Sequence, residues 1–313
     1  MEIRPYLVQA LSPLHAGTGQ TAGVIDLPIA RMRATGIPFV PGSTIKGVLR
    51  ALTDPGGESA EGDVHSAVFG PKRAQQGPQG DTVLDHAGAL IAADARLLAL
   101  PVRSFRGTFA LVTSPLLIEL ARRDLAESPA LSEQLPPSIP RLNGRRALVA
   151  KNCINVADRF IYLEDLDLPV TDDQQSQATA WARFIANAVP AAERSLIAER
   201  FVVVDDETMA FLWDTATQID TRIRIENGVV AEGALWTEES LPPETLLLGL
   251  LAARPSMRKN CAKSAKQLID WTVERSRAIV QLGGKATIGR GRCRLLTWTS
   301  QPSPGKEARR ANA

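Results

Sequence analysis

Apolar residues recur along most of this chain either at every second position or at every third to fourth position, and these periods predict strands and helices respectively. Short apolar stretches bounded by Pro, Gly or Ser predict strands at residues 1–11, 90–102, 108–113, 147–163, 201–204, 246–253 and 293–298. Helical spacing predicts helices that start near Ser43 and Ser114, and further helices at residues 171–187, 191–200 and 260–282. Because strands and helices are mixed without strict alternation, the pattern predicts an α+β fold.

Two alternating segments in the second half of the chain predict a β-hairpin. Residues 221–225 and 229–236 flank an Asn-Gly dipeptide, which is a strong signal for a tight hairpin turn. Arg222 and Arg224 fall on one face of the predicted ribbon. Arginines on a projecting hairpin suit contact with RNA, but charged residues on an exposed strand also prevent edge-to-edge aggregation. Both interpretations stay open.

The irregular stretch after the first strand carries a histidine, two glycines and an aspartate. Gly17 and Gly19 allow backbone amides to approach a ligand oxygen closely, so this turn predicts a phosphate or ribose contact, although a glycine turn can also simply reverse the chain. Asp26 could hold a divalent ion or act as a base, or it could cap a turn before Pro28. His15 could donate a proton to a phosphate or a leaving oxygen, or it could bond to loop backbone.

A second candidate contact is the start of the helix near Ser43. We expect Ser43 to be its N-cap, with Lys46 in the first turn and Arg50 four residues later. The unpaired amides of a helix N-terminus bind anions, so this segment predicts a phosphate contact. The order of glycines and lysine in a Walker A sequence is absent, which argues against nucleotide hydrolysis.

A third candidate contact is residues 283–292, which lie between a predicted helix and a predicted strand. This loop interleaves four glycines with Lys285, Arg290 and Arg292, a combination that can follow a phosphate backbone. Residues 254–294 carry eleven basic residues against two acidic ones, although the net charge of the whole chain is only +2. This local excess is typical of contact with a polyanion.

Other features of the composition exclude several classes of protein. The 313 residues are 44% hydrophobic, which is enough for a sizeable core. The three cysteines lie more than thirty residues apart, so they predict neither a disulfide framework nor a structural zinc site. No apolar run reaches the ~18 residues of a membrane span and no secretory signal is evident, so we expect a cytoplasmic protein.

Several of these motifs resemble the RAMP superfamily, the RNA-binding subunits of CRISPR effector complexes. Residues 283–292 resemble its glycine-rich loop, and residues 41–50 resemble the start of a helix in its backbone subunits. A narrower resemblance, to the repeated backbone nuclease subunit of the type III-B (Cmr) complex, covers residues 13–19, 23–31, 101–104 and 234–239.

The resemblance implies a modified RRM-like or ferredoxin-like palm with helical insertions and a projecting β-hairpin thumb. It implies one domain over residues 1–299, with a loop excursion at 54–88, a helical insertion at 171–200 and the thumb at 217–237, followed by a disordered tail at 300–313. Several copies would line up along a guide RNA together with other subunits. Each thumb would disrupt the duplex between guide and target at regular intervals.

The resemblance also implies an active site. Asp26 corresponds to the cleaving aspartate, His15 to an associated histidine, and Glu238 or Glu239 to a glutamate, of which Glu238 is the choice here. Ser240 stands where relatives are expected to carry an aromatic residue. The implied activity is cleavage of the paired target RNA, with Mg²⁺ or Mn²⁺ held at Asp26 and a 2′,3′-cyclic phosphate on the product.

Two other functions are compatible with the same fold. The chain could be a filament subunit that only holds guide RNA, without cutting. It could also be a ribonuclease that processes its own guide precursor, in which case His15 would matter more than Asp26.

Overall fold

The computed structural model describes residues 1–17, 25–56, 59–71, 75–76, 82–83, 86–142, 144–226, 229–276 and 279–298. Gly19, a predicted RNA contact, and the predicted tail at 300–313 lie outside the described residues. Within the described ranges, no helix is both long enough and apolar enough to cross a membrane. The chain mixes helices and strands, which confirms the expected α+β class.

The strands are β1 (Glu2–Ala10), β2 (Phe39–Val40), β3 (Gln75–Gln76), β4 (Thr82–Val83), β5 (Leu90–Ala92), β6 (Ala95–Ser104), β7 (Thr108–Thr113), β8 (Ala147–Val149), β9 (Phe160–Leu163), β10 (Leu166–Thr171), β11 (Phe201–Val204), β12 (Gln218–Glu226), β13 (Val229–Ser240), β14 (Leu246–Ala253), β15 (Ile279–Gln281) and β16 (Arg292–Leu296). The α-helices are α1 (Gly42–Leu52), α2 (Ala60–Phe69), α3 (Pro115–Ala126), α4 (Pro129–Ser132), α5 (Gln175–Ala186), α6 (Arg194–Ala198), α7 (Asp206–Thr215) and α8 (Ala265–Arg275), and short 3-10 turns are η1 (Ala191–Glu193) and η2 (Ala286–Ile288).

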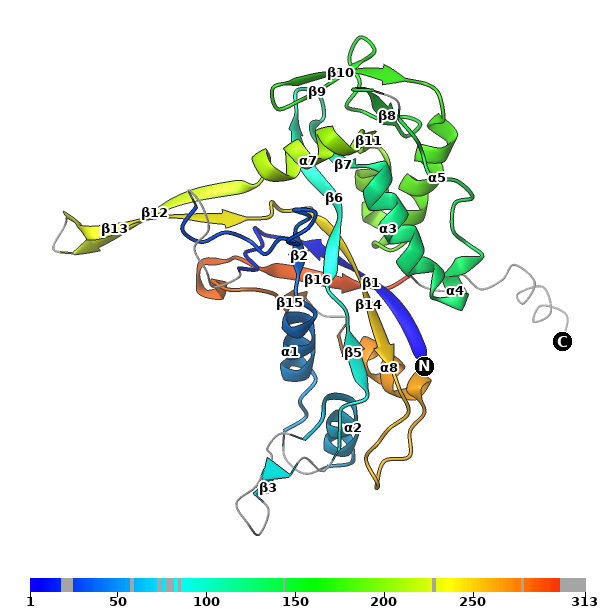
Figure 1. Ribbon diagram of the computed structural model, residues 1–313, viewed down its shortest axis with the longest axis vertical. Helices are drawn as coiled ribbons and strands as arrows, with labels where there is room; N and C mark the ends of the chain where they lie inside the picture. The colour runs from blue at the N-terminus through cyan, green and yellow to red at the C-terminus, as the bar shows by residue number, and fades with distance from the viewer. Residues whose placement is uncertain are drawn as a thin grey trace, which may run out of the picture.

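Strand β1 lies at the centre of the fold, between β14 and β16, and is antiparallel to both. Leu7 pairs with Leu248 on one side and with Leu296 on the other. The apolar run of β14 covers both faces of the sheet, as expected for a strand buried on both sides. Helix α8 packs against β1 and β14, and α1 packs against β5, so helices cover the lower end of the sheet in Figure 1.

The long strand β6 leaves this sheet and enters a second group of strands. Its neighbours follow in the order β6, β7, β11, β8, β10 and β9. Strand β9 then pairs back with β6 through Ser104 and Leu163, so the group closes on itself like a small barrel. Helices α3 and α5 pack beside it in the upper half of Figure 1, and Trp181, Phe184 and Trp298 lie in the buried cluster there.

The hairpin of β12 and β13 extends away from the body of the molecule (Figure 1). Its two strands pair with each other, and a bulge interrupts the register between Ile223 and Ile225. Between these two pairs β12 has only Arg224, whereas β13 has four residues, so the additional residues of the bulge lie on β13. The hairpin contacts the body at its base, through bridges from Leu14 and Leu27.

Two predicted helix boundaries are wrong, and two helices were not predicted. The helix expected over 260–282 begins at Ala265 and ends at Arg275, because the apolar residues that follow it form β15. Helix α7 was not predicted, although Asp205 caps it by accepting hydrogen bonds from the Thr208 backbone amide. The N-cap of α1 is Pro41 and not Ser43, which lies inside the helix. Within the predicted loop excursion at 54–88, α2 forms a helix.

The packing of β14 against β1 predicts a strong effect of a single methyl group. A Cβ at Gly249 would lie 2.5 Å from the buried Tyr6 hydroxyl oxygen, which donates to the Ala93 carbonyl. We expect Gly249→Ala to lower the free energy of unfolding by about 1–3 kcal/mol, measured by thermal or urea unfolding. Gly47→Ala is the control, because open space surrounds Gly47 in α1, and it should stabilise the protein by about 0.5–1 kcal/mol. Equal unfolding midpoints for the two variants would contradict this packing.

Candidate active site and nucleic-acid interface

Four segments that are distant in the sequence meet at the base of the hairpin. Two N-terminal segments pair with the end of strand β13 and the residue after it: Leu14 exchanges backbone hydrogen bonds of 2.8 and 2.9 Å with Leu241, and Leu27 donates to the Thr237 carbonyl at 3.1 Å. The glycine-rich loop joins them, since the amide of Gly284 donates to the carbonyl of His15 at 3.2 Å. The sheet-like backbone bonds therefore bring the predicted His15, Asp26, Glu238 and Lys285 into one region.

Asp26 is exposed and is held by a single residue of the hairpin. Its Oδ2 accepts hydrogen bonds from the Thr237 amide at 2.7 Å and from the Thr237 hydroxyl at 3.0 Å. These bonds, the backbone one first, lower the pKa of Asp26 below its usual value. Asp26 is therefore ionised at neutral pH and is a weak proton acceptor.

His15 is buried with one defined hydrogen bond. Its Nδ1 lies 2.7 Å from the carbonyl oxygen of Glu239. A carbonyl can only accept, so Nδ1 carries the hydrogen, and in the neutral ring Nε2 is left as the acceptor. A Cβ at Gly17 would lie only 2.7 Å from Nε2. Gly17 therefore leaves room beside the one ring nitrogen that can exchange a proton with a substrate.

Glu238 lies in an internal cluster on one face of β13. It is 2% exposed, accepts a hydrogen bond of 2.7 Å from the Trp236 indole and pairs with Lys285. Arg222 lies 3.5 Å away. Burial raises the pKa of Glu238, but hydrogen bonds from Lys285 and Trp236 and the nearby positive charges outweigh it and hold the pKa below its usual value. Glu238, the predicted catalytic glutamate, thus holds the glycine-rich loop to the hairpin.

Glu239 points to the opposite face of β13 and contacts the segment that carries Asp26. Its carboxylate accepts hydrogen bonds from the Ile29 amide at 3.0 Å, from Arg31 at 2.6 Å and from the Thr217 hydroxyl at 2.9 Å. Sequence reasoning missed Arg31 and Thr237, and it preferred Glu238 to Glu239. The available signal was the alternation of side chains along β13, which places adjacent glutamates on opposite faces.

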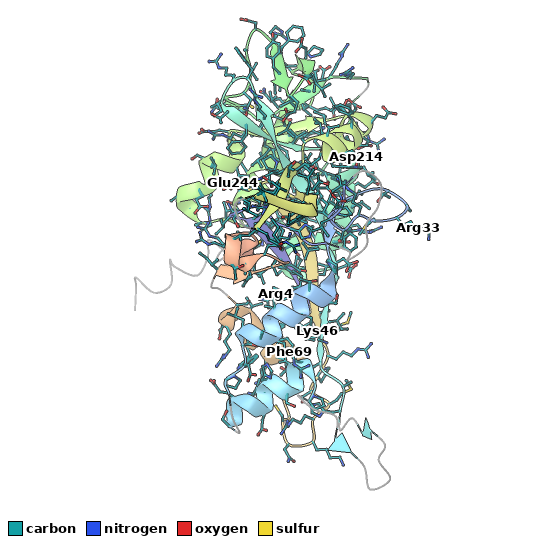
Figure 2. All side chains as sticks on the ribbon, turned by 90° about the vertical axis from the view of Figure 1, so that its left-hand side faces the viewer. Arg4, Arg33, Lys46, Phe69, Asp214 and Glu244 are labelled. Atoms are coloured by element: carbon teal, nitrogen blue, oxygen red, sulfur yellow. The ribbon has the colours of Figure 1, made fainter. Side chains whose placement is uncertain are left out.

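Several polar groups at the helix start near Ser43, the predicted anion site, make contacts within the protein. Asp94 accepts a hydrogen bond of 2.8 Å from the Gly42 amide, so a carboxylate already lies at this helix N-terminus. Lys46 donates to the Leu90 carbonyl at 2.7 Å, and Arg50 donates to the Pro71 carbonyl at 2.8 Å. Burial, and then the charge of Arg50, lower the pKa of Lys46. Figure 2, in which the hairpin points towards the viewer, shows Lys46 on α1 below the hairpin.

Arg290 also differs from its predicted role as an RNA contact. It is 5% exposed and donates to the Ser240 hydroxyl at 2.7 Å and to Asp220 at 2.5 Å. It therefore ties the glycine-rich loop to the hairpin base. Arg292 is exposed, and Arg224 is exposed beside Glu226. Both side chains are accessible to a ligand, and their role as RNA contacts stays a prediction.

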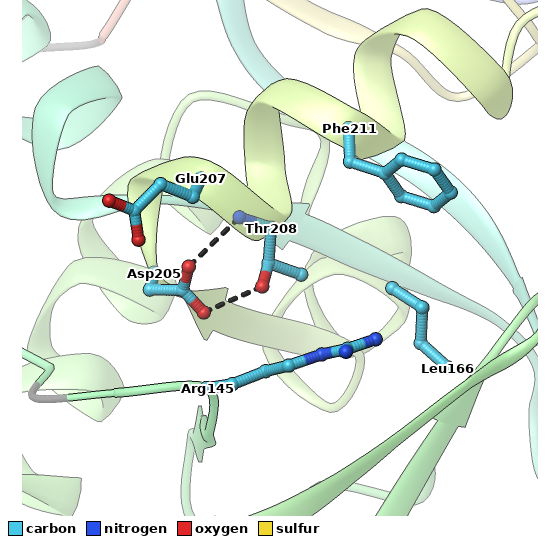
Figure 3. Close-up of a pocket in the computed structure, with 6 residues that line it drawn as sticks. All are labelled: Arg145, Leu166, Asp205, Glu207, Thr208 and Phe211. Atoms are coloured by element: carbon cyan, nitrogen blue, oxygen red, sulfur yellow. Dashed lines mark hydrogen bonds between the residues drawn. The ribbon is translucent and has the colours of Figure 1, made fainter.

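A cavity of about 390 Å³ lies apart from this region, and its lining contains no predicted site residue. Figure 3 shows the Arg145 side chain extended beneath the N-terminus of α7. The Asp205 carboxylate in this cavity accepts hydrogen bonds from Thr208, at 2.9 Å from the amide and 2.6 Å from the hydroxyl. These polar groups are used within the helix cap, so the cavity is not the candidate active site.

The whole chain has known relatives. Residues 7–294 match the RAMP superfamily. A protein of Pyrococcus furiosus named CRISPR system Cmr endoribonuclease Cmr4 is 31% identical over 293 residues, which cover 92% of this chain and 94% of that protein. The crystal structure of oligomeric Cmr4 from the same organism superimposes with a TM-score of 0.72 at 24% identity, covering 96% of this chain and 100% of that one.

A cryo-EM structure of the type III-B Cmr-beta complex bound to cognate target RNA contains a second similar chain. Its TM-score is 0.68 at 20% identity, and the match covers 95% of this chain and 97% of that chain. These matches span nearly the full length of each protein. The chain therefore belongs to the RAMP superfamily.

Proposed function

We propose that this chain is the repeated backbone subunit of a type III-B CRISPR complex, which binds guide RNA and cleaves complementary target RNA as an endoribonuclease. The full-length similarity to a Cmr endoribonuclease supports the activity. The oligomeric structure of one relative and the target-bound complex of another support assembly with further copies, other subunits and both RNAs. The observation that carries the proposal is an exposed, ionised Asp26 held at the base of a projecting hairpin.

In this proposal the body that contains the central sheet is an RRM-like palm, and the hairpin of β12 and β13 is the thumb. One face of the hairpin carries exposed apolar side chains, which suit contact with the faces of unstacked bases. These side chains are Ile219, Ile223, Ile225, Val230 and Leu235. Thr237, which holds Asp26, continues the same face towards the body. A target strand that is splayed open by the thumb would therefore pass close to Asp26.

Cleavage would proceed by attack of a target 2′-oxygen on the adjacent phosphorus. The new bond joins that oxygen to phosphorus, the bond from phosphorus to the 5′-oxygen breaks, and the products are a 2′,3′-cyclic phosphate and a 5′-hydroxyl. Because its lowered pKa makes Asp26 a weak base, we assign it to orienting the reacting groups and to holding a divalent cation, whose positive charge would stabilise the reacting phosphate. His15 Nε2, the acceptor of the neutral ring, takes the proton of the 2′-hydroxyl, and the imidazolium formed gives a proton to the leaving 5′-oxygen.

A divalent ion such as Mg²⁺ or Mn²⁺ fits this site only with ligands from RNA and water. Among the described residues no group of three or more His, Cys, Asp or Glu side chains could hold a metal. The chain offers the exposed carboxylate of Asp26, and Mg²⁺ commonly binds through one or two carboxylates together with phosphates and waters. A bound ion would neutralise charge on the reacting phosphate.

Guide RNA would contact the outer side of the glycine-rich loop and the exposed arginines. Arg292 and Arg224 are exposed, and Lys285 and Arg222 are partly exposed beside Glu238. Lys46 and Arg50 could contribute only after leaving the carbonyl groups that they contact now. The guide and the target would therefore meet at opposite sides of the hairpin base.

The first test is Asp26→Asn in a complex assembled with guide RNA and the partner subunits. The amide keeps the side-chain shape but removes the charge, so cleavage should slow by at least about 100-fold while target binding is retained. The measurement is the ladder of regularly spaced products on a denaturing gel. Asp173→Asn is the control, because Asp173 is another exposed aspartate that accepts from a threonine hydroxyl, at 3.3 Å. A ladder equal to that of the parent would favour the non-catalytic filament subunit.

The second test concerns the metal and the product. EDTA should abolish cleavage, and Mg²⁺ or Mn²⁺ should restore it, because only the metal neutralises the phosphate charge in this proposal. Mass spectrometry of the 5′ fragment should show a terminus one water lighter than a linear phosphate. Undiminished cutting in EDTA would refute the metal dependence. A linear phosphate terminus at the first time points would refute attack by the 2′-hydroxyl.

The third test separates exposed basic residues from those that bond internally. Arg292→Ala should weaken guide binding for every sequence and reduce the slope of log affinity against log salt by about one. Lys46→Ala should change that slope less, because the Lys46 ammonium is bonded to Leu90. Filter binding over a range of salt concentrations measures both. The arrangement described here would be wrong if Lys46→Ala reduced the slope more than Arg292→Ala.

A further inference from the structure

Glu239 contacts His15 directly, and it contacts the backbone that follows Asp26. Its backbone carbonyl accepts the hydrogen bond from His15 Nδ1 at 2.7 Å. Its side-chain Oε2 accepts from the amide of Ile29, three residues after Asp26, at 3.0 Å. Its own amide donates to the Leu27 carbonyl at 3.0 Å. One residue of the hairpin therefore fixes the imidazole and the backbone that follows Asp26.

The Glu239 carboxylate is buried but fully paired. It is 2% exposed, and besides Ile29 it is bonded to Arg31 at 2.6 Å and to the Thr217 hydroxyl at 2.9 Å. A buried carboxylate without partners would be costly, and several donors offset that cost here. An ionised group held by so many fixed donors has little freedom to move, so the segments that supply the donors are fixed relative to one another.

Arg31 extends this network to the body of the protein. Its guanidinium donates to the Trp213 carbonyl at 2.9 Å and to the Asp214 carboxylate at 3.1 Å, both on α7. Asp214 is labelled in Figure 2. The hairpin, the segment with Asp26 and helix α7 are thus joined through the pair of Arg31 and Glu239. Glu238, on the opposite face of β13, contacts Trp236 and Lys285 and has no part in this network.

We propose that Glu239, with Arg31, is a positioning residue for RNA cleavage. It sets the place of Asp26 relative to Nε2 of His15 and does not itself touch the RNA. This inference rests on the proposed cleavage function. It assigns to Glu239 the role of orienting the catalytic groups, and to Glu238 the role of holding the glycine-rich loop.

The test is Glu239→Gln in the assembled complex, with the complex in excess over target RNA. The rate constant for cleavage should fall about 10- to 100-fold, because a displacement of about 1 Å can have that effect. The fraction of target finally cleaved and the affinity for target should stay at the parental values. Glu119→Gln, an exposed glutamate on α3, is the control for the substitution itself. Thermal unfolding is measured for each variant.

Three outcomes would overturn the proposal. One is a parental rate constant for Glu239→Gln. Another is a lower cleaved fraction at an unchanged rate constant, which would mean that the residue serves only folding. The last is an equal decrease for Glu238→Gln, which would mean that any disturbance of the hairpin base slows cleavage.

If Glu239→Gln does not fold, Thr217→Val tests the same network more gently. It removes one donor to the carboxylate, and the same rate constant should show a smaller but measurable decrease; a parental value would overturn the proposal. Asp26→Asn, assembled in parallel, distinguishes failure of the proposed cleavage function from failure of the positioning role of Glu239. If the Asp26→Asn complex cleaves like the parent, the proposed cleavage function has failed. If Asp26→Asn abolishes cleavage but Glu239→Gln leaves the rate constant unchanged, only the positioning role is refuted.

Discussion

The alternation of side chains along β13 is the constraint on which the site depends. Successive residues of a strand must point to opposite faces. Glu238 consequently faces the glycine-rich loop, where it meets Lys285, and Glu239 faces the segment after Asp26, where it meets Arg31. A single strand thereby holds two loops from opposite ends of the chain. Shifting its register by one residue would exchange the two glutamates and break both sets of contacts.

The same strand sets the chemistry of the residues beside it. The Thr237 amide and hydroxyl keep Asp26 ionised, and the Glu239 carbonyl keeps the hydrogen of His15 on Nδ1. A carboxylate that stays charged and an imidazole nitrogen that can exchange a proton could take complementary parts in a reaction. Both features come from hydrogen bonds to neighbouring residues of β13, so the conformation of the hairpin base also sets the ionisation of Asp26 and the tautomer of His15.

Local signals in the sequence predicted the elements well, and distant contacts could not be predicted from it. The Asn-Gly dipeptide predicts the hairpin because turn and strands are adjacent. Arg290 has the exposed, loop-based context of an RNA contact, but its partners Asp220 and Ser240 lie 70 and 50 residues away and bury it. A distant residue also explains why Ser43 is not the expected N-cap: Asp94, from another loop, accepts a hydrogen bond from the first turn of that helix. Helix α7 is the opposite case, because the local signal at Asp205 was present and was overlooked.

Charged pairs at the base of the hairpin hold it in a fixed direction relative to the body. A two-stranded ribbon is marginally stable in water on its own, and this one carries its apolar side chains exposed. Its direction must then come from the few residues where it joins the body. Ion pairs suit this junction because the hydrogen bonds within them are directional. Separating the partners is also costly, because it leaves an unpaired buried charge. The clusters around Glu238 and Glu239 lie on opposite faces of β13 at that junction, so together they restrain the hairpin against tilting in either direction.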